Sequence, residues 1–338
     1  MKKIAILEPG AWGLTLGILL SKKNEVRFWY ENPAIALKIS KLRENDRLPD
    51  IKIPRDIFIS FKLREVIKNT NLILVASPSF NFRKTLLTLK SFENLPRTEK
   101  SLGRGLPPLL GIAKGIEKRT LKVPSQIVEE LLSNTPYAHL SGPGFARQII
   151  RGKPAKEVIA SRNKKFLKQL KELFKIKPLR VSTTTDLIGV QLAGALKNAL
   201  AINISLVEAG IQGPEVEKIK KGLIRLGLKE MIKIGKVMGA KRKTFSGPAG
   251  LEDLILTSTN LLSRNFQFGQ ALFSDAKKLR KEIIERKITI EGFDNVFAFH
   301  KLGKIHQLDL PMINEIYKVI YKKTSPEKAV KNLTALVF

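Results

Sequence analysis

A lysine in the middle of an apolar stretch is the first candidate for chemistry in this sequence. Lys197 lies within Leu187 to Glu208, a run that is apolar nearly all round and predicts a helix buried in its domain. Burial of an unpaired ammonium is costly and lowers the pKa of a lysine toward neutrality. Such a lysine suits general acid–base work on an alcohol or a carbonyl. The alternative is a side chain that follows the helix surface out to water.

A second lysine and an aspartate occupy positions that suit the same site. Lys114 follows Leu109 to Ala113, which predicts a strand, and ligands bind beyond the carboxyl ends of the strands in a doubly wound sheet. The alternative for Lys114 is an exposed loop lysine. Asp253 follows the loop that begins at Gly247, and its carboxylate is able to pair with a buried lysine.

Ser263-Arg264-Asn265 combines a hydroxyl, a guanidinium fork and an amide in three consecutive residues. This combination is well suited to clamp a phosphate, because the fork of an arginine forms two parallel hydrogen bonds to an oxyanion. The alternative is a helix cap followed by a surface arginine.

A glycine-containing turn follows the first predicted strand. The segment Glu8-Pro9-Gly10-Ala11-Trp12-Gly13 resembles the dinucleotide fingerprint G-x-G-x-x-G, with Gly10 and Gly13 in the second and third glycine positions. Glu8 replaces the first glycine and adds both a Cβ and a negative charge near a diphosphate. The turn therefore indicates either a cofactor site or a purely structural strand-turn-helix. Glu31, after the second predicted strand, suits the ribose hydroxyls of a dinucleotide.

The elements that must position these residues differ between the two halves of the chain. The first half alternates short β-branched runs with helical stretches, and the second half keeps a helical period. We therefore predict an α/β fold class: an N-terminal Rossmann-type doubly wound sheet (residues 1–184) and an all-helical C-terminal domain (residues 185–338) for substrate and catalysis. A polar loop is expected between Ser91 and Pro108. The predicted strands are Lys3 to Leu7, Glu25 to Trp29, Asn71 to Ala76, Leu109 to Ala113, His139-Leu140, Glu157 to Ser161 and Leu179 to Ser182.

Composition narrows the possible classes of protein. The chain of 338 residues is 43% hydrophobic and has no cysteine, which excludes disulfides and thiolate chemistry. Three scattered histidines show no metal-ligand spacing, and we expect no metal. No long uncharged apolar run or signal core is apparent, so we expect a cytoplasmic protein without membrane insertion. The net charge of +31 raises the alternative of a nucleic-acid-binding protein, but the basic residues are dispersed and lack an aromatic ladder, so no specific nucleic acid is expected.

The ordered motifs together resemble the bacterial type of NAD(P)-dependent glycerol-3-phosphate dehydrogenase over essentially the full length of the chain. Blocks that carry the resemblance include Gly10-Ala11-Trp12-Gly13, Lys114-Gly115-Ile116-Glu117, Leu140-Ser141-Gly142-Pro143, Gly194 to Asn198 and Ser263-Arg264-Asn265. The resemblance implies interconversion of sn-glycerol 3-phosphate and dihydroxyacetone phosphate with NAD or NADP, a homodimer and a role in glycerophospholipid synthesis.

The resemblance also implies roles for individual residues. Lys197 would transfer the proton, with Lys114 and Asp253 beside it at the oxygens of the substrate. The implied substrate contacts are Lys114, Gly142, Gly144, Asn198, Asp253, Ser263, Arg264 and Asn265. The implied cofactor contacts are Gly10, Ala11, Trp12, Gly13, Glu31, Lys114, Ala146, Arg264 and Glu291.

Several residues depart from the pattern of this family. Glu8 and Glu252 replace glycines, and Gly144 replaces a serine. These departures support an alternative, a catalytically weakened or non-catalytic relative that only binds ligand; retention of Lys197 with Asp253 argues against it. A 2-hydroxyacid dehydrogenase is disfavoured because its substrate is a carboxylate, whereas this site offers a phosphate clamp. Relatives commonly have arginine in place of Glu31, so we predict a preference for NADH over NADPH of roughly ten-fold.

Overall fold

The chain divides into two compact units. The computed structural model describes residues 1–93, 105–285 and 290–337. Met1–Ala113 and Pro124–Leu187 form the first unit, and Lys114–Val123 and Ile188–Phe338 form the second. The segment Lys114–Val123 thus belongs with the helical part of the chain. Most of the polar loop expected between Ser91 and Pro108 lies outside the described residues.

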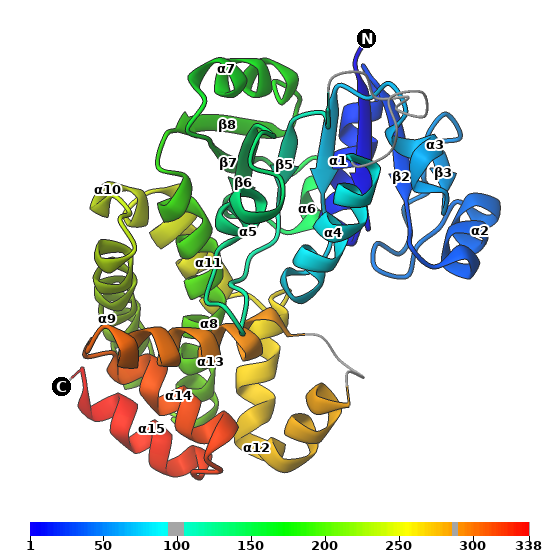
Figure 1. Cartoon of the computed structure of the whole chain (residues 1–338). Helices are drawn as coiled ribbons and strands as arrows, with labels where there is room; N and C mark the ends of the chain where they lie inside the picture. The colour runs from blue at the N-terminus through cyan, green and yellow to red at the C-terminus, as the bar shows by residue number, and fades with distance from the viewer. Residues whose placement is uncertain (94–104, 286–289, 338) are drawn as a thin grey trace. The chain divides into compact units, whose positions relative to one another are not determined.

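One eight-stranded sheet forms the centre of the first unit, in the order β3-β2-β1-β4-β5-β6-β7-β8 (Figure 1). All neighbouring strands are parallel except β6 and β7, which are antiparallel. The predicted α/β class is confirmed. The strands are β1 (Lys3–Leu7), β2 (Glu25–Trp29), β3 (Phe58–Ser60), β4 (Leu72–Val75), β5 (Leu109–Gly111), β6 (Tyr137–Ser141), β7 (Ala155–Ala160) and β8 (Leu179–Thr184).

The strand β3 is absent from the strands predicted on sequence, because three residues are too few to show an alternating pattern. It pairs with β2 through Arg27 and Phe58, and the sheet supplies the context that its sequence lacks. The inner strands β1 and β4 are nearly continuous apolar runs, as expected for strands covered on both faces. Ile4, Ile6 and Leu74 are fully buried in the core between the sheet and its helices.

The strand order places the carboxyl end of β1 at a topological switch point. From β1 the chain crosses to β2 on one side, and from β4 it crosses to β5 on the other, so right-handed crossovers put α1 and α4 on opposite faces. The helices of this unit are α1 (Ala11–Ser21), α2 (Pro33–Leu42), α3 (Leu63–Ile67), α4 (Phe82–Glu93), α5 (Pro124–Leu131), α6 (Ala146–Ile149) and α7 (Lys164–Leu173), with a 3₁₀ turn η1 (Ser79–Asn81) before α4.

The second unit contains helices, and no strand, among the residues that the structure describes. Its helices are α8 (Leu187–Gly210), α9 (Glu215–Val237), α10 (Arg242–Phe245), α11 (Asp253–Ser258), α12 (Arg264–Ile284), α13 (Glu291–Ile305), α14 (Pro311–Tyr321) and α15 (Pro326–Ala335), with a π-helical turn η2 (Pro248–Glu252) before α11. The helix α15 was not predicted on sequence, although Ser325 caps it by accepting the backbone N–H of Lys328.

The helix α8 is the centre of this second core. It is long and apolar enough to cross a membrane, but 94% of its most apolar window is buried inside the structure. Leu196, Leu200 and Ile204 are fully buried against residues of the surrounding helices. Packing within the unit therefore accounts for the apolar character of α8.

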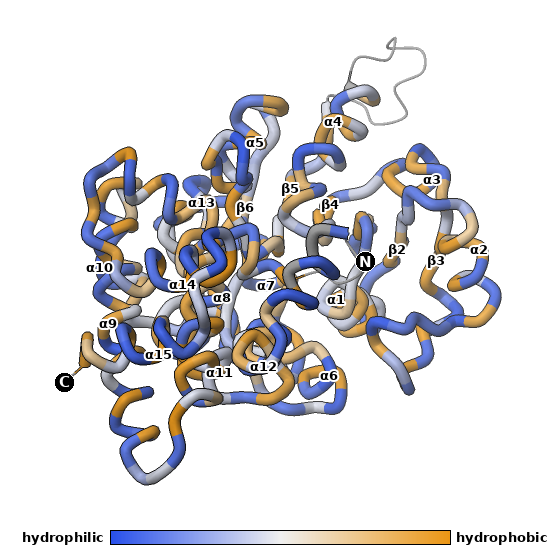
Figure 2. Tube along the Cα trace, turned by 90° about the horizontal axis from the view of Figure 1, so that it is seen from below, coloured by the Kyte–Doolittle hydropathy of each residue, from blue (hydrophilic) through white to orange (hydrophobic). Residues whose placement is uncertain are grey.

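Hydrophilic stretches occur on helices of both units, for example α2 and α9 (Figure 2). Their basic residues include Lys38 on α2 and Lys218 and Lys221 on α9, which are exposed. The positive charge is thus spread over solvated helix faces in both units, as the sequence predicts.

Candidate active site

Two lysines meet one aspartate in the second unit. The Nζ atom of Lys114 lies 2.7 Å from Oδ2 of Asp253, and Nζ of Lys197 lies 3.0 Å from Oδ1 of the same carboxylate. Asp253 is 1% exposed and Lys197 is 7% exposed, so Lys197 does not extend along its helix to water. The carboxylate of Asp253 therefore offsets the repulsion between the two ammonium groups. Without it, two buried cations would not be stable side by side.

Burial dominates the electrostatics of this cluster. It lowers the pKa of Lys197 to about 8; the positive charge of Lys114 acts in the same direction, and the charge of Asp253 acts against it. Burial by itself would raise the pKa of Asp253, but attraction to Lys114 and Lys197 and their hydrogen bonds outweigh it and lower that pKa. At neutral pH the cluster thus holds a stable carboxylate beside a lysine that is able to release a proton.

Thr257 joins the cluster, and the sequence analysis missed it. Nζ of Lys197 donates to Oγ1 of Thr257 at 2.7 Å, and Oγ1 of Thr257 lies 3.3 Å from Oδ1 of Asp253. Asp253 and Thr257 are four residues apart on α11 and so share one helix face. That spacing is the signal from which Thr257 could have been found once Asp253 was a candidate.

The position of Lys114 depends on two asparagines. Asn295 accepts the backbone N–H of Ile116 at 3.2 Å and donates to the carbonyl of Lys114 at 3.2 Å. The side-chain amide of Asn198 donates to the same carbonyl at 3.3 Å. Asn295, on α13, is fully buried and was not among the predicted site residues. A polar residue on the apolar face of that helix was its only signal in the sequence.

The three residues of the predicted phosphate clamp have different environments. The hydroxyl of Ser263 accepts the backbone N–H of Phe266 at 3.2 Å and caps the start of α12. The amide of Asn265 donates to Oδ1 of Asn198 at 2.9 Å and accepts the backbone N–H of Gly292 at 3.0 Å. Arg264 is exposed, so its guanidinium is the most accessible group of the three.

Glu291 lies close to the same cluster. Its Oε2 accepts the amide of Asn198 at 3.3 Å. Burial raises the pKa of Glu291, while the positive charges of Arg264, Lys197 and Lys114 act to lower it. The structure thus brings together six predicted residues of the second unit: Lys114, Lys197, Asn198, Asp253, Asn265 and Glu291.

The glycine turn of the first unit lies between β1 and α1. Helix α1 begins at Ala11 with Gly10 as its N-cap and has no acidic residue in its first turn. By helix geometry the first N–H groups of α1 lack acceptors within the helix, so this end attracts an anion. A Cβ on Gly13 would lie 2.8 Å from Cβ of Ala76, so only glycine allows α1 to approach the sheet this closely.

Two carboxylates lie at the carboxyl ends of β1 and β2. Glu8 has a left-handed backbone with φ of 53°, and its Oε1 accepts the backbone N–H of Glu31 at 2.5 Å. The carboxylate of Glu31 instead pairs with Lys84 of α4 at 2.7 Å. Glu31 therefore lies at the expected strand end, but its side chain is paired with a cation.

The segment after β6 contains the other predicted residues of the first unit. A Cβ on Gly142 would lie 2.3 Å from the backbone oxygen of Lys156, so the chain passes too close to β7 for any side chain there. A Cβ on Gly144 would lie 2.5 Å from Cδ1 of Ile149. Ala146 begins α6, and its carbonyl accepts the hydroxyl of Thr15 on α1 at 3.3 Å.

Comparison with known proteins identifies the family. The models of the N-terminal and C-terminal parts of NAD-dependent glycerol-3-phosphate dehydrogenase match residues 3–167 and 186–331. The chain belongs to this family. The glycerol-3-phosphate dehydrogenase (NAD(P)+) of Nitrosomonas eutropha is 33% identical over 332 residues, 98% of this chain and 96% of that protein. The corresponding enzyme of Wigglesworthia glossinidia brevipalpis is also 33% identical.

The fold is also similar to that of a solved structure from this family. The glycerol-3-phosphate dehydrogenase of Coxiella burnetii has a TM-score of 0.88 and 29% identity, with 98% of each chain covered. The predicted resemblance to the bacterial type is confirmed, as is the expectation of an oxidoreductase with NAD or NADP as its cofactor. The comparisons give no support to the alternative of a non-catalytic relative.

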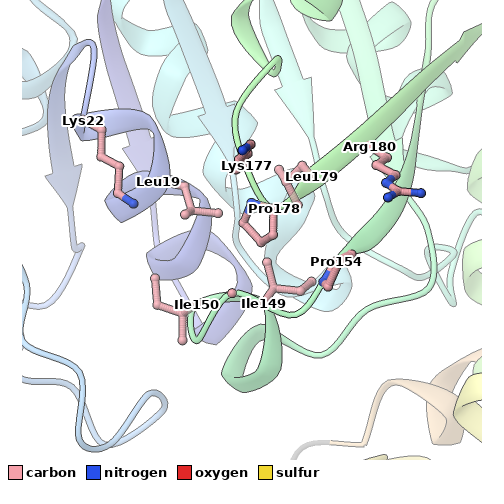
Figure 3. Close-up of a pocket in the computed structure, with 10 residues that line it drawn as sticks. Leu19, Lys22, Ile149, Ile150, Pro154, Lys177, Pro178, Leu179 and Arg180 are labelled. Atoms are coloured by element: carbon pink, nitrogen blue, oxygen red, sulfur yellow. The ribbon is translucent and has the colours of Figure 1, made fainter.

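A pocket of about 530 Å³ in the first unit is formed by the last turns of α1, the segment after α6 and the start of β8 (Figure 3). Apolar side chains such as Leu19 and Ile149 line it together with Lys22, Lys177 and Arg180. Its lining includes no residue of the glycine turn.

Among the described residues, no group of three or more histidine or acidic side chains is placed to bind a metal ion.

Proposed function

We propose that this chain interconverts sn-glycerol 3-phosphate and dihydroxyacetone phosphate with NAD(H) or NADP(H). The observation that carries the proposal is the buried arrangement of Lys197 and Lys114 on Asp253. A carbinol needs a group that takes its proton as hydride leaves carbon, and a lysine with a lowered pKa supplies that group. Full-length similarity to enzymes named for this activity supports the choice of substrate.

The proposed chemistry assigns a separate task to each residue of the cluster. In oxidation, the neutral amine of Lys197 accepts the hydroxyl proton; in reduction, the ammonium returns it to the carbonyl oxygen. Lys114 remains cationic and stabilises the negative charge that develops on that oxygen. Asp253 orients both lysines, and Thr257 fixes the direction of the Lys197 amine. The nicotinamide, when bound, accepts or supplies the hydride.

We propose that the dinucleotide binds at the glycine turn and the phosphorylated substrate near Arg264. Gly10, Ala11, Trp12 and Gly13 would hold the diphosphate at the open end of α1, where the structure offers backbone N–H groups and no acidic side chain in the helix. Glu31 would lie toward the ribose. The roles of Lys114, Ala146, Arg264 and Glu291 toward the cofactor rest on the resemblance.

The substrate phosphate would be bound mainly by Arg264, since this guanidinium is exposed whereas Ser263 and Asn265 are buried. Asn198 would connect this end of the site to Lys114 through its hydrogen bond to the Lys114 carbonyl. Contacts of Gly142 and Gly144 with the substrate rest on the resemblance.

The experiment that tests the proposed function follows NADH and NADPH absorbance with dihydroxyacetone phosphate, in wild type and Lys197→Ala. We expect the wild type to oxidise the dinucleotide and the variant to turn over about a hundredfold more slowly or worse. Dinucleotide affinity should be nearly unchanged, because the alanine removes only the group that transfers the proton. Near-normal turnover in Lys197→Ala would contradict its role.

We further propose a cytoplasmic homodimer that supplies glycerol 3-phosphate for glycerophospholipid synthesis. The resemblance to the bacterial enzymes is the support for each part. Sedimentation equilibrium should give a mass near twice 37.9 kDa. Depletion of the chain in its own cells should make growth depend on added glycerol; a monomer, or growth that needs no supplement, would contradict the corresponding part.

A further inference from the structure

The carboxylate of Glu8, the residue after β1, lies at the carboxyl end of the neighbouring strand β2. The backbone N–H of Glu8 donates to the carbonyl of Trp29 at 2.8 Å, which joins the two strand ends. The side chain of Glu8 then reaches beyond β2, where it accepts the N–H of Glu31. Glu8 keeps this position with a left-handed φ of 53°, which a residue with a Cβ adopts only at a cost.

The carboxylate of Glu31 is directed to another partner. It forms an ion pair with Lys84 in which the side chains of Glu31 and Lys84 are 50% and 63% exposed. A carboxylate that is paired with a lysine in water has a weakened field, and so it repels a second anion less strongly. Glu31 is therefore directly paired with a cation, whereas the carboxylate of Glu8 accepts an uncharged backbone N–H.

Glu8 is less exposed to water than the charged residues around it. Burial raises the pKa of Glu8, the negative charge of Glu31 adds to this, and the backbone hydrogen bond from Glu31 and the charges of Arg47 and Lys84 act to lower that pKa. Glu8 is half-buried, whereas Glu31, Arg47 and Lys84 are exposed. Solvent thus screens the charge of Glu8 less than that of Glu31.

In dinucleotide-binding folds, an acidic group at the end of the second strand accepts the adenosine ribose hydroxyls. We propose that Glu8, from the first fingerprint position, is that group in this chain and excludes the 2′-phosphate of NADP, in place of Glu31. The inference rests on the proposed function and names the residue that selects between its two cofactors. The residue that departs from the glycine fingerprint is thereby the one that selects the cofactor.

The test measures dissociation constants of NADH and NADPH by dinucleotide fluorescence on the full chain without substrate. Wild type should bind NADH more tightly. Glu8→Gln keeps the size of the side chain and removes its charge, so the ratio of the NADPH and NADH constants should fall by about ten-fold. Glu8→Gly should weaken binding of NADH, because the acceptor for its ribose hydroxyls is lost, and tighten binding of NADPH, because the charge that repels its 2′-phosphate is lost.

Two further variants make the result specific. Glu31→Gln with Lys84→Gln removes the ion pair without changing net charge, and the ratio should shift by less than about three-fold. Glu172→Gln removes the same charge from α7, which packs on β7 and β8 at the far edge of the sheet, and should leave both constants unchanged. Circular dichroism checks that each variant is folded.

Two results would overturn the inference: a ratio in Glu8→Gln equal to that of wild type, or an equal shift in the double variant, which would return selection to Glu31. Binding is measured without turnover, so the two proposals can fail separately. A Glu8-dependent ratio without oxidation of NADH by dihydroxyacetone phosphate would contradict the proposed reaction alone. Turnover with a ratio insensitive to Glu8 would contradict only the role of Glu8.

Discussion

At the scale of single residues, the lowered pKa of Lys197 predicts how activity depends on pH. Burial lowers this pKa to about 8, and oxidation of glycerol 3-phosphate requires the neutral amine. The kcat/KM for oxidation should therefore rise with pH through about 8 and then level, whereas the kcat/KM for reduction should decline over the same range. Initial rates at substrate concentrations well below KM, measured in both directions against pH, check this.

Asp253 offers a test of the cause of that pH dependence. Its negative charge acts to raise the pKa of Lys197. In Asp253→Asn the midpoint for oxidation should therefore move to lower pH, in addition to a lower turnover number from poorer orientation of the lysines. A midpoint that stays in place or moves upward would show that Lys197 is not the titrating group.

Arg264 is the residue that we expect to bind the substrate phosphate. Arg264→Lys keeps the charge but removes the two-pronged donor, so the Michaelis constant for dihydroxyacetone phosphate should rise by about ten-fold or more, with a smaller change in turnover. Arg225→Lys, an exposed site on α9 in the same unit, is the matched control and should leave both constants unchanged. Equal kinetics of the two variants would exclude Arg264 as the phosphate contact.

At the scale of elements, the contact between α9 and α14 depends on one buried glutamate. The carboxylate of Glu230, on α9, accepts the backbone N–H groups of Met312 and Ile313 at 2.6 and 3.2 Å, in the first turn of α14. In Glu230→Ala these buried donors lose their acceptor, so the free energy of unfolding should fall by about 1–3 kcal/mol. Chemical denaturation measures it, and Glu327→Ala, an exposed site in the first turn of α15, should change it by less than about 0.5 kcal/mol.

The contribution of Glu230 to the free energy of unfolding depends on pH in a direction that its raised pKa predicts. Burial raises the pKa of Glu230 from 4.5 to about 7, so the folded state binds more protons between these values. The stability from this proton is fully present below pH 4.5 and is lost as pH rises to about 7. The difference in the free energy of unfolding between wild type and Glu230→Ala should therefore become smaller over this interval. A difference that grows would contradict a raised pKa of Glu230.

Local sequence patterns predicted several elements well because their hydrophobic period is strong. Lys3–Leu7, Glu25–Trp29 and the long helix α8 agree with the structure in type and nearly in extent. The short strand β3 and the helix α15 were missed. In α15 the apolar face is narrow and polar residues dominate, so packing on neighbouring helices rather than propensity stabilises it.

At the scale of the whole molecule, the chain crosses between units three times rather than once. The segment Lys114–Val123 leaves the sheet unit after β5 and joins the helical unit before α5. Its packing places a lysine from the end of a strand in the same unit as α8 and α11. The change in sequence period is most simply interpreted as a single boundary near residue 184. Such a boundary assigns the segment Lys114–Val123 to the first unit, whereas its contacts are with the second.

The sequence by itself determined the class of fold, the family and the types of residue available for chemistry, because hydrophobic period and ordered motifs are local properties of the chain. Only the tertiary structure decided which of these residues meet. Lys114 and Asp253 are 139 residues apart in sequence yet share a hydrogen bond, and Thr257 and Asn295 enter the site through such long-range contacts. It also decided that Glu8 reaches the end of β2 while Glu31 pairs with Lys84. Contacts of this kind follow from how strands and helices pack, and no local pattern encodes them.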